Sequence, residues 1–351
     1  MNRIKRLFLL IFCMFQNVIK NTKVTYITDS ADWVIKDIGQ SLKKEIKEFN
    51  LHITTTSFGL RNSTIHYGSI GTFLGKSKIK LPHSSNKIIV TWFHVLPNED
   101  RIDLVHEADK YVNFWHTSSR ATKKKMIALG LTKEKIILIP LGVNFDYFNI
   151  LNKQNKKDSI GIPSSKIVIG YFQKDGDGWG DGNKPKLIKG PDVFCNVVEK
   201  LSQKYEIYIL LTGPARGYVK NFLRNKNIPY RHDYLKDSNQ VSNYYKACDL
   251  YLVTSREEGG PKSILESMAC GVPLISTKVG MAEDIIEEGL NGFLVEVEDV
   301  DSIYNRACYL IDNQDLRMSL INNALKTVKK YDWSNIGNQY NEKIYKVRLN
   351  D

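Results

Sequence analysis

The chain has few cysteines, and their spacing does not fit a disulfide framework or a zinc site. It has five, scattered over 351 residues without any C-x-x-C pair, at Cys13, Cys195, Cys248, Cys270 and Cys308. A reducing cytoplasm is therefore the expected compartment, and most of these thiols are expected to pack in cores. No H-E-x-x-H or other metal-ligand spacing occurs.

The sequence also lacks an apolar run long enough to cross a membrane. The apolar stretch Leu7–Phe15 is shorter than the roughly 20 residues that a spanning helix needs. It matches a signal-peptide core in length, but no small-residue cleavage site follows it. Basic residues flank it on both sides. Two structures fit residues 1–22: a helix at a membrane interface, and a helix packed on the first domain.

Acidic residues are in deficit, mainly in the first half of the chain. The formal net charge is +12; residues 1–150 hold 22 Lys and Arg against 12 Asp and Glu, and residues 151–351 hold 28 against 26. No recognition helix, zinc finger or aromatic RNA-binding pattern accompanies this excess, so nucleic acid is not expected as a partner. An anionic membrane surface, a lipid-diphosphate acceptor and a merely solvated face all fit it.

The most informative stretch runs from Thr254 to Gly280. It predicts a strand end, a glycine loop, a short helix that begins at Pro261 and stops at Gly271, and a second strand. Glu258 falls in the loop, and Glu266 follows inside the helix after seven residues. Between these carboxylates lie the free amides of a helix N-terminus, which form an anion site. A nucleotide-sugar offers hydroxyls to the carboxylates and a diphosphate to the amides.

This stretch resembles the E-x7-E signature of retaining glycosyltransferases of family 4, also called glycosyl transferases group 1. The resemblance is specific over about residues 167–345 and weaker before them. It implies an α/β protein of the GT-B fold, in which two Rossmann-like domains face a cleft and a C-terminal helix crosses back to the N-domain. It also implies a hexosyltransferase-like, metal-independent enzyme that needs no cofactor beyond its NDP-sugar donor.

That architecture divides the chain into five parts. A basic and apolar segment precedes an acceptor domain, a linker, a donor domain and a closing helix, over residues 1–22, 23–150, 151–165, 166–330 and 331–351. The implied acceptor is a glycan or a lipid-linked sugar. Cell-surface polysaccharide or glycolipid synthesis is the expected process, in the cytoplasm or peripherally at the inner face of the plasma membrane.

The resemblance assigns the catalytic roles to three residues. Glu258 would hold hydroxyls of the transferred sugar, and His94, which follows the predicted strand of residues 87–92, would lie near the sugar and the acceptor. Lys189 matches the second member of the family's Arg-x4-Lys pair, which neutralises the leaving diphosphate. Lys184 stands at the arginine spacing and Lys186 is nearby, so lysine point charges replace the guanidinium fork.

Further residues are expected to bind the donor. Glu266 would accept hydrogen bonds from the ribose, residues 230–236 would pass the base, and Arg216 would reach a phosphate or lie on the surface. The predicted donor-binding set is Glu266, Gly259, Gly260, Ser263, Ile264, Lys184, Lys186, Arg216, Tyr234 and Leu235.

Two loops depart from the family's pattern. The loop after the first strand, Asp29-Ser30-Ala31, has no glycine, whereas family members often carry Gly-Gly there. The glycine-rich loop, Gln173–Gly190, has glycine at positions 176, 178, 180 and 182 and is predicted to be flexible. Its acidic residues do not follow the spacing of a calcium loop.

Other functions would use the same architecture. A GT-B phosphorylase or sugar-nucleotide epimerase would share the cleft, and a non-catalytic protein would bind the sugar nucleotide without turnover. In the family's mechanism the acceptor hydroxyl attacks the face that the diphosphate leaves. A phosphate oxygen takes its proton, so no protein nucleophile is implied.

Overall fold

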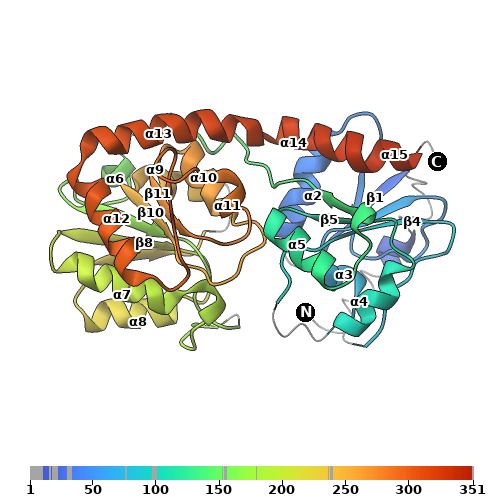
Figure 1. Cartoon of the computed structure of the whole chain (residues 1–351), viewed down its shortest axis with the longest axis horizontal. Helices are drawn as coiled ribbons and strands as arrows, with labels where there is room; N and C mark the ends of the chain where they lie inside the picture. Colours follow the sequence, from blue (N-terminus) through green and yellow to red (C-terminus); the bar gives the residue numbers. More distant parts are fainter. Residues whose placement is uncertain are drawn as a thin grey trace. The chain divides into compact units, whose positions relative to one another are not determined.

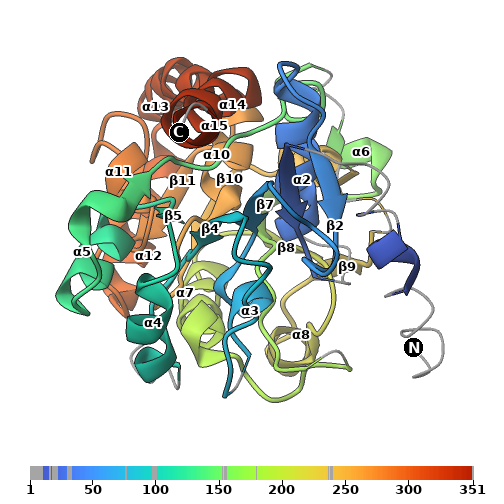
Figure 2. The same cartoon turned by 90° about the vertical axis from the view of Figure 1, so that its right-hand side faces the viewer.

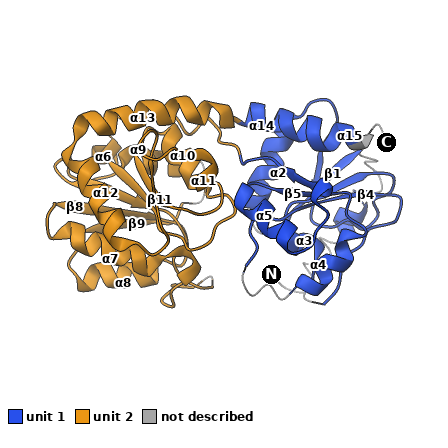
Figure 3. Cartoon of the chain, viewed as in Figure 1, with its two compact units in different colours: residues 1–141, 333–351 blue, residues 142–332 orange. Residues whose placement is uncertain are grey.

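The structure is a computed structural model that describes residues 11–15, 17, 23–29, 34–75, 77–96, 101–151, 153, 156–178, 180–235, 237 and 240–349. The chain forms two compact units (Figures 1 and 3). Unit 1 comprises residues 1–141 and 333–351, and unit 2 comprises residues 142–332. Each unit contains one six-stranded parallel sheet. The assignment of acceptor and donor domains to these parts stays a prediction.

The sheet of unit 1 has the order β2-β1-β3-β4-β5-β6. Its strands are β1 (Val24–Ile27), β2 (His52–Thr54), β3 (Thr64–Tyr67), β4 (Lys87–Thr91), β5 (Phe114–Thr117) and β6 (Ile136–Leu138). Its helices are α2 (Val34–Glu45), α3 (Ile70–Phe73), α4 (Ile102–Asp109), α5 (Arg120–Ala128), η1 (Lys133–Lys135), α14 (Trp333–Tyr340), the π-helical η5 (Asn341–Tyr345) and α15 (Lys346–Leu349).

The last helices of the chain belong to unit 1. Helix α14 contacts α2, and Figures 1 and 2 show the two side by side. Two buried pairs join this segment to the sheet. The Tyr345 hydroxyl lies 2.6 Å from His66 Nδ1, and the Tyr340 hydroxyl lies 3.0 Å from His116 Nε2. The C-terminal helix therefore crosses back to the first unit, as the resemblance implies.

Strand β5 begins later than the sequence predicts. The apolar run of residues 111–115 favours a strand there, but the amides of Tyr111 and Val112 donate to Ala108 O at 3.0 and 3.1 Å. These residues extend the last turn of α4, because their hydrogen-bond acceptors lie in that helix. The strand starts at Phe114, which places His116 within the sheet, fully buried.

The described part of the N-terminal segment packs on unit 1. Residues 11–15 and 17 are helical, and Asn17 Nδ2 donates to the carbonyls of Thr56 and Phe58 at 3.0 and 2.9 Å. Asn17 is buried, whereas the side chains of Ile11, Phe12 and Phe15 are exposed. No described helix has the length and apolar character that a membrane crossing requires.

Unit 2 has the strand order β12-β11-β10-β7-β8-β9. Its strands are β7 (Ile167–Tyr171), β8 (Ile207–Thr212), β9 (Tyr230–Asp233), β10 (Leu250–Val253), β11 (Leu274–Thr277) and β12 (Phe293–Val295). Its helices are α6 (Lys156–Ser159), η2 (Leu187–Lys189), α7 (Pro191–Ser202), α8 (Gly217–Asn225), α9 (Val241–Ala247), α10 (Lys262–Ala269), α11 (Ala282–Ile285), α12 (Val300–Asp312), α13 (Gln314–Val328) and η4 (Lys329–Tyr331).

The central strands of unit 2 are buried because helices cover the sheet. Helices α7, α8 and α12 share one apolar core with β7, β8 and β10, while α9 contacts β7 and α10 contacts β10. Parallel strands covered in this way read as continuous apolar runs, such as Leu250–Val253, in which every residue is buried.

In both sheets the chain order reverses beside the first strand. In unit 1, β2 lies on one side of β1 and β3 on the other; in unit 2, β8 lies on one side of β7 and β10 on the other. The loops at the carboxyl ends of these strands diverge at the reversal, which is where open α/β sheets bind ligands. The loops after β1 and β3, and those after β7 and β10, are therefore the candidate ligand sites of the two units.

Candidate functional site

The loop after β10 holds Glu258 in a polar cluster. Its Oε1 accepts hydrogen bonds from Lys189 Nζ at 2.6 Å, Ser255 Oγ at 2.9 Å and Gln173 Nε2 at 3.1 Å. The Glu258 side chain is 11% exposed and that of Lys189 is 22% exposed. Within the described residues nothing donates to Oε2. The carboxylate is therefore fixed through one oxygen, and the other can accept from a ligand hydroxyl.

Two glycines bring the loops of this cluster together. Gly190, at φ 62°, follows Lys189, and a Cβ there would lie 1.8 Å from Thr254 O at the end of β10. Gly280, at φ 49°, would place a Cβ 2.4 Å from Glu258 O. Any larger residue at either position would push apart the segments that carry Lys189 and Glu258. The sequence shows both glycines, but it does not show which backbone each one meets.

Helix α10 begins one residue later than predicted. Pro261 is the N-cap, with ψ 96°, and Lys262 is the first helical residue. The Ile264 amide, which the sequence places among the free donors, donates to Pro261 O at 3.0 Å. The amides of Lys262 and Ser263 have no preceding turn to receive their protons, so they form the anion-binding end of this helix.

Glu266 lies inside α10 and is held by neighbouring side chains. Its Oε2 accepts from the Tyr245 hydroxyl at 3.0 Å, and its Oε1 lies 3.8 Å from Lys262 Nζ. Burial, with nearby Tyr251 and Glu266, raises the pKa of Tyr245 well above its usual value, so the phenol stays protonated and donates. The side chain of Glu266 is 13% exposed. Access to a ligand is therefore limited to one edge of this carboxylate.

The predicted lysines differ in their surroundings. Burial lowers the pKa of Lys186, and the positive charges of Lys189 and Lys174 lower it further. Lys186 thus shares a cationic cluster with Lys189 beside Glu258. In contrast, the Lys184 side chain is 83% exposed and lies 3.8 Å from Asp177. The structure brings Lys186, and not Lys184, into the buried cluster.

The glycine-rich loop forms a hairpin over its described residues, and its predicted flexibility stays a prediction. Gly176 and Pro185 form an antiparallel bridge, and the Gly176 amide donates to Ala215 O at 2.9 Å. A Cβ at Gly182 would lie 2.4 Å from Ala215 O. Gly176 and Gly182 therefore allow close backbone packing, whereas a Cβ at Gly178 or Gly180 would meet nothing within 4 Å.

Arg216 is buried, so the predicted surface position is wrong. Its Nε lies 2.9 Å from Asp175 Oδ2, its Nη2 donates to Tyr171 O at 2.6 Å, and both charged side chains have no exposed area. Burial raises the pKa of Asp175 to about 6, although the Arg216 charge opposes the shift. The pair ties the hairpin to β7 and to the start of α8. Contact between Arg216 and a phosphate stays a prediction.

The remaining predicted residues lie on loops. Tyr234 is 65% exposed and Leu235 is partly buried, and both follow β9 at the carboxyl-end edge of the unit 2 sheet. Gly259 and Gly260 connect Glu258 to α10. His94 is exposed in unit 1, three residues beyond β4. Gln173 and Ser255 were not singled out from the sequence, although their places after β7 and β10 could have indicated them.

No group of three or more His, Cys, Asp or Glu side chains gathers as metal ligands would among the residues that the structure describes. The cysteines carry free thiols, and Cys195, Cys248 and Cys270 are buried. Burial raises the pKa of Cys248 well above its usual value and that of Cys270 to about 12, so both thiols stay protonated as packing groups.

Comparison with known families identifies the part of the chain that carries the Glu258 cluster. Residues 185–327 match the family described as glycosyl transferases group 1. Over these residues the chain is similar to that family. N-acetyl-alpha-D-glucosaminyl L-malate synthase of Bacillus anthracis is 28% identical over 58% of this chain and 52% of its own. UDP-Gal:alpha-D-GlcNAc-diphosphoundecaprenol alpha-1,3-galactosyltransferase of Escherichia coli is 26% identical over 56% and 52%.

Solved structures that resemble this chain agree on its fold. HepE of Anabaena, in complex with UDP-glucose, is 16% identical, has a TM-score of 0.76, and covers 93% of this chain and 100% of its own. Sucrose-phosphate synthase of Thermosynechococcus elongatus has a TM-score of 0.71 at 13% identity, over 93% and 99%. The fold is GT-B. The chain spans about half the length of the curated relatives it matches.

Proposed function

We propose that the chain is a retaining, metal-independent glycosyltransferase that moves a sugar from a nucleoside-diphosphate sugar to a glycan or lipid-linked acceptor. The observation that carries this proposal is the Glu258 cluster at the reversal point of the unit 2 sheet. It combines an oriented carboxylate, a lysine pair and a helix N-terminus, which match the hydroxyls and the diphosphate of one ligand. The names of the two relatives describe a synthase and a galactosyltransferase.

The donor would be held at both ends in unit 2. Lys189, Lys186 and the amides at the start of α10 would bind the diphosphate, with Gly259 and Gly260 allowing close approach. Stabilising the departing diphosphate with fixed charges and dipoles is the largest contribution that this cluster can make to the rate. Uridine is the proposed base, because HepE was solved with UDP-glucose. The exposed ring of Tyr234, beside Leu235, would pack against it.

The two glutamates would recognise hydroxyl groups. Glu258 Oε2 would accept from the transferred sugar, while Lys189, Ser255 and Gln173 keep the carboxylate in place through Oε1. Glu266, steadied by Tyr245, would accept from the ribose. His94 of unit 1 is assigned to the acceptor.

Transfer would proceed with retention and without a protein nucleophile. The acceptor oxygen forms a bond to the anomeric carbon on the face from which the diphosphate departs. The bond from that carbon to the diphosphate oxygen breaks, and a phosphate oxygen takes the acceptor's proton. Glu258 would serve to position the sugar, since one of its oxygens already carries three hydrogen bonds.

The experiment combines binding with product release. UDP should raise the melting temperature of the protein, because a ligand that binds only the folded state stabilises it. With UDP-glucose and UDP-galactose as donors and a panel of glycan and lipid-linked acceptors, UDP should appear only when an acceptor is present. The product's anomeric proton coupling should match that of the donor. An inverted product, or epimerisation of the donor without acceptor, would overturn the proposal; UDP binding without any turnover would favour a non-catalytic protein.

A cytoplasmic protein at the inner face of the plasma membrane is the proposed location. The described start of the chain exposes Ile11, Phe12 and Phe15 beside a basic unit. Apolar side chains of this kind enter the interfacial layer, while Lys and Arg attract anionic lipid.

A further inference from the structure

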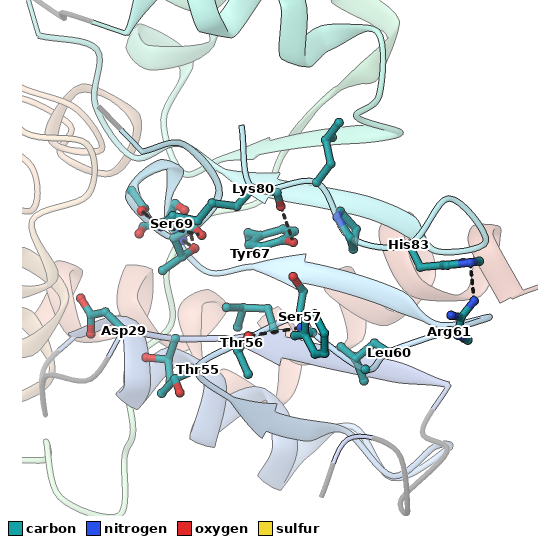
Figure 4. A pocket seen from close by; sticks show the side chains of 18 residues that line it. Asp29, Thr55, Thr56, Ser57, Leu60, Arg61, Tyr67, Ser69, Lys80 and His83 are labelled. Atoms are coloured by element: carbon teal, nitrogen blue, oxygen red, sulfur yellow. Dashed lines mark hydrogen bonds between the residues drawn. The ribbon is translucent and has the colours of Figure 1, made fainter. Parts of the chain in front are cut away.

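Unit 1 contains its own pocket at the reversal point of its sheet. The pocket has a volume of about 810 Å³ and is lined by the loops that follow β1, β2 and β3 and by residues 80–83 (Figure 4). It occupies the same place in its sheet as the Glu258 cluster does in the sheet of unit 2. Its lining does not include His94, which follows β4.

Hydroxyl groups dominate the lining. They come from Thr28, Thr55, Thr56, Ser57, Ser69 and Thr72. Thr28 is 5% exposed, and its Oγ1 has no hydrogen-bond partner in the described chain. Two apolar side chains of the lining, Phe58 and Leu81, are 64% and 46% exposed. Hydroxyl donors and acceptors beside an exposed aromatic ring suit a ligand that has many hydroxyls and an apolar face.

One end of the pocket is cationic. Arg61 Nη1 contacts His83 Nε2 there, as Figure 4 shows, and His83 Nδ1 lies 2.9 Å from Ser85 Oγ. The Lys80 side chain extends away from Arg61 toward Ser69, where its Nζ donates to the carbonyls of Gly71 and Thr72 at 3.1 and 3.3 Å (Figure 4).

Within the described chain neither Arg61 nor Lys80 pairs with a carboxylate, although both line the same cavity. Burial and the charge of Lys78 lower the pKa of Lys80, as expected for an ammonium without an anionic partner. A guanidinium that lacks a carboxylate partner can offer its fork to a carboxylate or a phosphate.

The end of the pocket opposite Arg61 holds one carboxylate, Asp29, and the Lys80 side chain extends toward that side. Asp29, which follows β1, lies beside Thr55, at the far side of the cavity from Arg61 (Figure 4). Its carboxylate can accept hydrogen bonds from hydroxyls but repels an anion. An anionic group is therefore favoured at Arg61, which lies far from Asp29, whereas the ammonium of Lys80 already donates to two backbone carbonyls.

We propose that this pocket binds a sugar residue that carries a phosphate or a carboxylate, with the anionic group at Arg61 and the hydroxyls toward Asp29 and the threonines. This residue is part of the acceptor, a statement that rests on the proposed function. Binding itself requires neither the donor nor turnover, so the two proposals can fail separately.

The test measures binding by ligand-observed NMR, with UDP present to occupy unit 2. The probes are glucose 6-phosphate, glucuronic acid, glucose and inorganic phosphate. Glucose 6-phosphate and glucuronic acid should bind about tenfold more tightly than glucose, because their anionic groups accept charge-assisted hydrogen bonds from the Arg61 guanidinium. Arg61→Gln should remove that preference, and Arg61→Lys should restore part of it. Lys78→Gln, which removes the same charge from a residue outside the lining, should keep it.

Each outcome decides the proposal. Equal binding of glucose and the sugar acids, or an unchanged preference in Arg61→Gln, would overturn it. Inorganic phosphate binding as tightly as glucose 6-phosphate would also overturn it, because the hydroxyl-lined part would then contribute nothing. If Glu258 variants lose transfer but still bind the probes, the proposal for the unit 1 pocket is supported independently of the proposed function. Circular dichroism checks that the Arg61 variants, changed at an exposed side chain, remain folded.

Discussion

At the scale of single residues, the proposed role of each lysine in binding the diphosphate depends on which charges are buried together. Lys189 and Glu258 form a half-buried pair at 2.6 Å, whereas Lys184 extends into solvent near Asp177. The family's spacing treats Lys184 and Lys189 as one pair. The structure distinguishes them, because only the cluster around Glu258 excludes enough water for a charge to act strongly on a phosphate.

Lys189→Met should lower kcat/KM by about 100-fold or more, the loss typical of removing one fixed donor from a developing negative charge. It also leaves the Glu258 carboxylate without its cation. Lys184→Met is the matched control, and its effect should stay within about threefold because an exposed charge is screened by solvent. Steady-state kinetics measure kcat/KM for both variants. Equal losses in kcat/KM would contradict the larger role assigned to Lys189.

Gly190→Ala should lower the free energy of unfolding by more than about 2 kcal/mol, since left-handed strain and a collision with Thr254 O combine. Gly213→Ala is the control. Gly213 also has positive φ, at 86°, but a Cβ there would meet nothing within 4 Å, so only about 1 kcal/mol of strain is expected. Urea unfolding of both variants measures the difference. Similar midpoints would show that the contact between η2 and β10 is dispensable.

At the scale of elements, the helices that end the chain are joined to unit 1 by buried histidines. Burial lowers the pKa of His116 to about 4 and that of His66 well below its usual value. Tyr340, Tyr345 and Thr91 face these rings, and no carboxylate in the described chain does. Both imidazoles are therefore neutral in the folded unit.

Stability should fall as the pH drops below about 6.5, the usual pKa of histidine in an unfolded chain. Between pH 6.5 and about 4, His116 is protonated in the unfolded state but neutral in the folded state. This difference lowers the free energy of unfolding by up to about 3 kcal/mol. Unfolding midpoints at pH 7.5 and 5 measure the slope. His116→Gln removes the titrating group and should reduce it; an unchanged slope in that variant would assign the pH dependence elsewhere.

The helical start of the chain should bind anionic vesicles. Phe12→Ser with Phe15→Ser should weaken co-sedimentation with phosphatidylglycerol vesicles at low salt, since both rings are exposed. Phe58→Ser, which also removes an exposed ring, is the control. High salt should weaken binding of the wild type. Absence of any salt-sensitive binding would remove the membrane proposal.

The sequence predicts most elements, because their signals are local. The predicted strand of residues 87–92 corresponds to β4, Lys87–Thr91, and Gly271, at φ 62°, follows the end of α10 as predicted. The shifted start of β5 and the folded glycine-rich loop could not be predicted. Both depend on hydrogen-bond partners that the fold supplies, such as Ala215 O for the Gly176 amide.

Site prediction was limited in the same way. The motif names Glu258 and Lys189, but the roles of Gln173 and Ser255 follow from strands β7 and β10 being neighbours in the sheet. Arg216 shows the reverse error: a lone arginine after a strand suggests a phosphate ligand or a surface residue. Its burial against Asp175 depends on a loop more than thirty residues earlier in the sequence.

At the scale of the whole molecule, the two units have the same sheet topology around their first strands. Each has a parallel sheet whose order reverses beside its first strand, and each gathers polar groups at that reversal. Unit 2 gathers an oriented carboxylate and cations, which suit a nucleotide-sugar. Unit 1 gathers hydroxyls, with Arg61 at one end, which suit a charged sugar. We therefore propose that unit 2 binds the donor and unit 1 the acceptor.

Glu258 is proposed to position the transferred sugar. The most direct measurement is the rate of sugar transfer from UDP-glucose or UDP-galactose to the acceptor identified by screening, in Glu258→Ala and in the neighbouring control Glu257→Ala, with folding checked by circular dichroism. We expect the transfer rate of Glu258→Ala to fall at least about 100-fold while the protein remains folded, and that of Glu257→Ala to stay near the wild-type rate. Undiminished transfer by folded Glu258→Ala would contradict the proposed role of Glu258.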